Sequence, residues 1–209
     1  PAAAADSGTA GTGAATIVQG DDRWTLENAA LRVVLAFADG SLKMESFYNK
    51  AADKEYLTAD AESYLFSYTY GEYINGTTWT VEDYKKNGSV PSAGKDTVTL
   101  RSDDGSWKSG KARVTDITMT LAEGKEEILG KQLEITLTNT AAAFETRLVF
   151  GVYDGEAGFH YQNFVKNTGD KKMVITESDV LSLSFPNGPH YLHYVNAKTS
   201  ASDGAENAT

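Results

Sequence analysis

Residues 131–139, Lys-Gln-Leu-Glu-Ile-Thr-Leu-Thr-Asn, alternate apolar and polar side chains, and this stretch decides the fold. Successive side chains of a β-strand point to opposite faces, so Leu133, Ile135 and Leu137 all face the same side. Such a strand has one face on a core and the other toward water. The pattern predicts an antiparallel sheet with one buried face.

The same alternation recurs along the rest of the chain. Three later runs show it, at residues 148–152, 159–165 and 173–185. Earlier, a hairpin is predicted over residues 29–48 around Asp39-Gly40, because glycine adopts a positive φ at no steric cost. Residues 112–121 are also predicted to form a strand, and a slip in its apolar phase between Val114 and Ile117 indicates a bulge. Turn-forming residues separate the runs and no segment has a capped helical period, so we predict an all-β fold, a two-sheet antiparallel β-sandwich.

Both ends of the chain lack this periodicity. Residues 1–16 are rich in Ala, Gly, Ser and Thr, like the low-complexity stretch that follows a cleaved bacterial signal peptide. This composition favours a secreted or periplasmic location. Residues 197–209 are expected to be a tail or the start of a linker. The β-sandwich domain is therefore predicted to span residues 17–196.

The composition narrows the classes of partner. The 209 residues carry a formal net charge of −10, which argues against nucleic acid and anionic membrane surfaces as partners. No apolar run approaches the roughly 20 residues that a membrane span needs. The chain has no cysteine, which excludes disulfides, thiolate metal sites and cysteine nucleophiles.

No catalytic motif stands out in the sequence. No serine lies in a Gly-x-Ser-x-Gly elbow, and no EF-hand spacing or phosphate-binding glycine loop occurs. His190 and His193 are too few ligands for a typical zinc site. A mutarotase would need a His and a Glu converging on one sugar ring, and His160 with Glu177 is the only such pair to nominate. We therefore predict no catalytic residue, no metal site and no cofactor.

Residues 58–94 differ from the rest because they are aromatic, polar and turn-rich. Tyr and Trp rings stack on the flat apolar faces of sugars while their polar tips donate hydrogen bonds. Trp79 is the first choice, because residues 75–78 before it form a predicted turn. The alternative for each ring is that it fills the core or covers a sheet edge. The candidate carbohydrate-binding residues are Trp79, Tyr70, Tyr73, Tyr84 and Trp107.

Several short motifs resemble one known family. Tyr153-Asp154-Gly155 leads into one strand, Asn167-Thr168-Gly169-Asp170 follows it, and a later strand runs to Phe185-Pro186. The opening Leu26-Glu27-Asn28, followed by the hairpin, fits the same pattern. Over residues 24–195 the chain resembles the N-terminal β-supersandwich, a galactose-mutarotase-like domain, of α-galactosidase-like glycoside hydrolases.

The resemblance implies a function for the domain. In these enzymes the sandwich precedes a (β/α)₈ barrel that carries the catalytic aspartates, so no catalytic residue is carried over to this chain. The expectation is an N-terminal accessory domain of an extracellular glycoside hydrolase, which binds an oligo- or polysaccharide or shapes the active-site entrance beside a catalytic barrel. Two alternatives stay open, a stand-alone mutarotase-like or lyase-like enzyme and a structural or adhesive surface domain.

Overall fold

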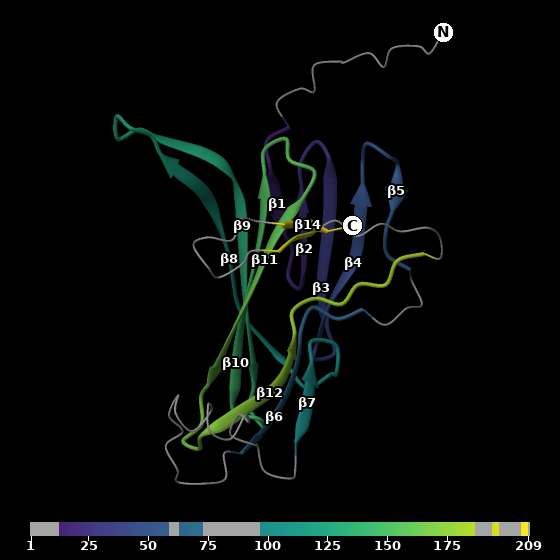
Figure 1. The fold of residues 1–209 in the computed structure, drawn as a ribbon, viewed down its shortest axis with the longest axis vertical. Helices are drawn as coiled ribbons and strands as arrows, with labels where there is room; N and C mark the ends of the chain where they lie inside the picture. The colour runs from purple at the N-terminus through teal and green to yellow at the C-terminus, as the bar shows by residue number, and fades with distance from the viewer. Residues whose placement is uncertain (1–12, 59–62, 73–96, 187–193, 197–205, 209) are drawn as a thin grey trace.

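Most of the alternating segments form β-strands (Figure 1). The computed structural model describes residues 13–58, 63–72, 97–186, 194–196 and 206–208. The strands in this part of the chain, β1 to β14, all pair in antiparallel fashion. The described residues contain no helix, and so none that is long and apolar enough to cross a membrane. The predicted all-β, antiparallel sandwich is confirmed.

The N-terminal part forms a five-stranded sheet in chain order. The predicted hairpin is confirmed as β3 and β4, and its turn has Asp39 at φ 49° and Gly40 at φ 73°. Apolar residues on one face, including Leu26, Val33 and Leu35, are fully buried. The strands are β1 (Thr16–Gln19), β2 (Arg23–Glu27), β3 (Leu31–Ala38), β4 (Ser41–Asn49) and β5 (Lys54–Glu55).

The central alternating run belongs to a four-stranded sheet of order β11-β10-β9-β8. Leu133 and Ile135 of β9 lie opposite Phe150 and Leu148 of β10, and all four side chains are fully buried. β8 is irregular, but not where the bulge was predicted: the pairing is regular from Val114 to Ile117, and the register shifts lie between Ser109 and Ala112 and between Ile117 and Thr118. The strands are β8 (Lys108–Thr120), β9 (Glu126–Asn139), β10 (Phe144–Tyr153) and β11 (Phe159–Asn167).

A three-stranded sheet of order β12-β6-β7 completes the core. Its strands are β6 (Ser67–Glu72), β7 (Val98–Arg101) and β12 (Met173–Asp179). Residues 173–185 were predicted to form one long or broken strand, and the strand is broken. β12 is irregular between Ile175 and Glu177 and ends at Asp179, and Ser182 then makes an isolated bridge to Tyr64.

The two ends of β10 contact different sheets, and this arrangement defines the sandwich. At one end the Phe144 ring lies 4.6 Å from the Tyr70 ring of β6. At the other end the Tyr153 carbonyl accepts a hydrogen bond from Asn28, which follows β2. The four-stranded sheet is therefore one layer, and the five-stranded and three-stranded sheets lie one beyond the other as the second layer (Figure 1).

The predicted domain boundaries need one adjustment at the N-terminus. Residues 1–12 lie outside the described part, but Ala15 is buried and its amide donates to Asp154 Oδ1 at 2.7 Å. β1 begins at Thr16, so the last residues of the predicted tail belong to the fold. Near the other end β13 (Tyr194–Asn196) pairs with β14 (Glu206–Ala208), which places a short strand inside the predicted C-terminal tail.

Candidate functional site

The candidate sugar-binding segment connects two neighbouring strands. β6 ends at Glu72 and β7 begins at Val98, and Tyr70 pairs directly with Val98. The connecting residues 73–96 therefore leave and return at the same end of the three-stranded sheet. Tyr73, Trp79 and Tyr84 fall in this segment and lie outside the described residues. The same holds for Asn75 and Asp83, which with Glu72 are the predicted acceptors of hydrogen bonds from sugar hydroxyl groups. Their role in sugar binding stays a prediction.

The other two candidate rings lie in the core. Tyr70 is 7% exposed and meets Phe144 edge to face, and Trp107 is 3% exposed and meets Phe66 in the same way. The Trp107 indole N–H donates to the Arg101 carbonyl at 2.8 Å. A ring buried in this way has no face left to stack on a sugar, so Tyr70 and Trp107 are withdrawn from the predicted platform. They instead fix β6 and the end of β7, the two strands between which the segment lies.

Charged residues flank the start of the segment. Glu72, the last residue of β6, accepts a charge-assisted hydrogen bond from Lys171 Nζ at 2.9 Å. This pair raises the pKa of Lys171 above its ordinary value, chiefly through the hydrogen bond to Glu72. Both side chains are more than half exposed, so the pair orients the Glu72 carboxylate without burying it. Glu72 can still accept a hydrogen bond from a hydroxyl group.

The structure separates the one acid–base pair that the sequence suggested. His160 lies opposite Gly151 of β10. The neighbours of Gly151, Phe150 and Val152, face inward, so the His160 side chain is on the outer face of the four-stranded sheet. Glu177 lies opposite Thr69 on the outer face of the three-stranded sheet, and its Oε2 is 3.4 Å from Thr69 Oγ1. The two side chains leave the sandwich on opposite sides and do not converge on one substrate.

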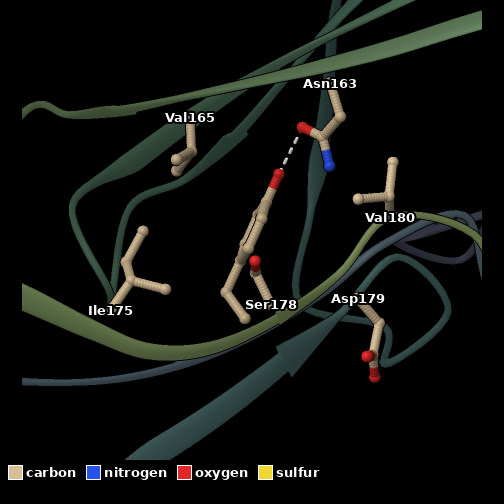
Figure 2. A pocket seen from close by; sticks show the side chains of 7 residues that line it. Asn163, Val165, Ile175, Ser178, Asp179 and Val180 are labelled. Carbon is tan, nitrogen blue, oxygen red and sulfur yellow. Dashed lines mark hydrogen bonds between the residues drawn. The ribbon is translucent and has the colours of Figure 1, made fainter. Parts of the chain in front are cut away.

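A small pocket lies between β11 and β12 (Figure 2). Its volume is about 180 Å³, below the roughly 300 Å³ at which typical ligand pockets begin. Aliphatic side chains form part of its wall and polar groups form the rest. The lining residues are Tyr68, Asn163, Val165, Ile175, Ser178, Asp179 and Val180.

Two polar side chains of the pocket, those of Tyr68 and Asn163, belong to a network that reaches the core. The Tyr68 hydroxyl donates to Asn163 Oδ1 and lies 3.0 Å from Thr146 Oγ1, which is fully buried (Figure 2). Burial raises the pKa of Tyr68, so the phenol is neutral at physiological pH. Apart from the Asp179 carboxylate, which accepts a hydrogen bond from the Tyr64 hydroxyl, the pocket therefore offers neutral hydrogen-bonding groups and aliphatic walls. These groups suit contact with another surface better than acid–base chemistry.

No group of three or more His, Asp or Glu side chains that could hold a metal ion occurs within the described residues. Of the three histidines, His160 is described, and His190 and His193 lie outside this part of the chain.

Two motifs on which the family resemblance rests meet in space. The buried Asn28 side chain donates to the carbonyls of Tyr153 and Glu156 at 2.6 and 2.8 Å. Its Oδ1 accepts from the amides of Ala30 and Leu31. Asn28 therefore joins the turn after β2 to the turn after β10, which lie in opposite layers.

Comparison with known proteins adds no family to this picture. No protein-family model matches the chain, and no match was found among curated proteins. The fold and the positions of the candidate residues are therefore the basis for a functional proposal.

Proposed function

We propose that this chain is a non-catalytic β-sandwich that binds carbohydrate through the aromatic residues of segment 73–96. In this proposal it serves as an accessory domain of a secreted or periplasmic glycoside hydrolase. The observation that carries the proposal is the position of the segment between paired strands β6 and β7. Binding residues are often found on loops that a rigid scaffold holds in place.

The scaffold around the segment meets this requirement. Tyr70 of β6 packs on Phe144, and the buried Trp107 indole donates to the carbonyl of Arg101, the last residue of β7, so both strands next to the segment are tied to the core. Segment 73–96 contains the one tryptophan of the chain that is not in the described core, Trp79. Tyr73 and Tyr84 lie in the same segment, which gives three amphipathic rings for stacking on pyranose faces.

An accessory role is favoured over a mutarotase-like activity by one observation. His160 and Glu177, the pair nominated for that chemistry, project from opposite outer faces.

A glycan array tests the proposal. The intact chain should retain at least one oligo- or polysaccharide, with a dissociation constant of roughly micromolar to millimolar, or about 4 to 8 kcal/mol. Trp79→Ala should abolish retention and keep the circular dichroism spectrum of the wild type. Phe185→Ala is the matched control, since this ring is 45% exposed and lies outside the segment, and it should bind as wild type.

Two results would contradict the proposal. Retention of no glycan by the intact chain would remove carbohydrate binding and leave docking to a catalytic domain as the accessory role. Equal loss of binding in Trp79→Ala and Phe185→Ala would remove the segment as the site.

A further inference from the structure

β11 borders the four-stranded sheet, and among the described strands it pairs with β10 alone. An edge strand presents unpaired backbone N–H and C=O groups to any other strand, so proteins protect such edges. The nine residue pairs between β11 and β10 run without a register shift, which leaves β11 regular over its whole length.

The other described edges carry the features that block strand pairing. β8 has two register shifts, and β12 has one. β1 and β7 are four residues long and β5 only two. Bulges and short length are established means of protecting edges, and β11 has neither.

The side chains of β11 also leave the core open along this edge. Val165 lies opposite the buried Thr146 and so faces inward, yet it is 36% exposed. Ile175 of β12, which faces inward opposite Tyr70, is 39% exposed. The pocket of Figure 2 lies between these two side chains. On the outer face Phe164 is 43% exposed, with the Arg147 guanidinium 4.2 Å from its ring centroid.

The charge distribution allows a second copy of this chain to approach along β11. The chain carries a net charge of −10, so two copies repel each other over most of their surfaces. β11, with sequence Phe-His-Tyr-Gln-Asn-Phe-Val-Lys-Asn, contains no Asp or Glu and one Lys. Two copies can therefore meet along β11 without placing carboxylates opposite one another.

We propose that β11 pairs in antiparallel fashion with β11 of a second copy of this chain, with Phe164 at the twofold axis. Residues at equal distances from Phe164 then lie opposite each other, which keeps inward-facing residues opposite inward-facing ones. Phe164 packs beside its own counterpart on the outer face, and Val165 lies opposite Asn163 of the second copy. The two four-stranded sheets become one continuous sheet, and the exposed inward-facing side chains are covered.

The mass of the intact 209-residue chain in solution tests this proposal. Light scattering after size exclusion, over loading concentrations from about 1 µM to about 1 mM, should show the mass rise from 22.5 kDa toward twice that value. Val165→Lys places an inward-pointing charge on the edge and should weaken dimerisation at least tenfold. Ile128→Lys is the matched control, because Ile128 is 52% exposed on β9, away from this edge, and should dimerise as wild type.

Hydrogen exchange gives a second test that does not depend on any variant folding. Exchange of amides in residues 162–167 should slow as the protein concentration rises, while exchange in β1 and β7 should stay constant. A monomer at every concentration would overturn the proposal. So would a dimer whose β11 amides exchange at a concentration-independent rate, or a dimer that Ile128→Lys disrupts and Val165→Lys does not.

Discussion

The side-chain amide of Asn28 donates a hydrogen bond to the backbone carbonyl of Tyr153 across a distance of 2.6 Å. The two residues are far apart in the sequence and belong to opposite layers of the sandwich. All four hydrogen bonds of the Asn28 side chain are made to backbone groups, and the side chain is buried. This residue therefore holds the two layers together at one end of the molecule.

Replacing Asn28 with Ala should lower the free energy of unfolding by about 2 to 4 kcal/mol, because it leaves several backbone groups without partners. Asn28→Asp should destabilise as well, since it keeps the acceptor but places a carboxylate against two carbonyls. Urea denaturation followed by circular dichroism measures both changes. Asn49→Ala is the control: Asn49 makes two hydrogen bonds at a half-exposed turn, and its loss should cost about 1 kcal/mol or less.

Gly40 and Gly124 provide a matched pair, because their backbones share φ values of 73° and 74°. A Cβ on Gly40 would overlap the Gly105 carbonyl, whereas a Cβ on Gly124 would have no atom within 4 Å. Gly124→Ala should cost about 1 to 2 kcal/mol, the strain of a left-handed residue. Gly40→Ala should cost at least about 2 kcal/mol more, since it also pushes away the loop that ends at Trp107. Equal losses of unfolding free energy in the two variants, measured by urea denaturation, would contradict this expectation, because they would show that the loop moves aside without a cost in energy.

Glu55 should make stability depend on acid pH. Burial opposes its charged form, but hydrogen bonds from the Ser46 hydroxyl and from backbone amides, including that of Phe47, outweigh burial and lower the pKa of Glu55 below 4.5. A folded-state pKa below the unfolded one stabilises the fold above about pH 4.5, and this stabilisation disappears as the pH falls through the folded-state pKa. The carboxylate is largely exposed, so the effect should stay below about 1 kcal/mol.

Unfolding free energies of the wild type and of Glu55→Gln, measured from about pH 3 to about pH 7, check this expectation. The wild type should be the more stable protein near neutrality, and the difference should vanish at the acid end. Ser46→Ala keeps the Glu55 charge and removes one hydrogen-bond donor to it. This variant should therefore lose part of the stability that the wild type gains between acid and neutral pH. A difference that grows toward acid pH would contradict the assignment.

The strands were predictable from the sequence because they depend on local patterns. Leu133, Ile135 and Leu137 alternate in sequence and are fully buried on one face of β9. Asp39-Gly40 likewise predicted a turn that needs positive φ, and both residues adopt it. These features depend on side-chain period and backbone sterics, which neighbouring residues determine.

The burial of the aromatic rings was not predictable in the same way. Trp107 was a candidate binding residue because of its ring, but its amide donates to the Gly40 carbonyl at 3.0 Å. That contact joins two turns distant in the sequence and folds the indole into the core. Tyr70 has a local signal, since Phe66, Tyr68 and Tyr70 alternate and are all buried. This alternation predicts that Tyr70 faces the core, and it is a better guide to the position of the ring than the aromatic composition of the region.

The most direct measurement of the central claim is iodide quenching of tryptophan fluorescence with and without the glycan that the array selects. Trp24 and Trp107 are 1% and 3% exposed, so iodide should reach only the third tryptophan, Trp79. The account predicts that saturating glycan protects the quenchable fraction and that Trp79→Phe removes this fraction. Quenching that persists in Trp79→Phe, or glycan that binds without changing the quenching, would contradict it.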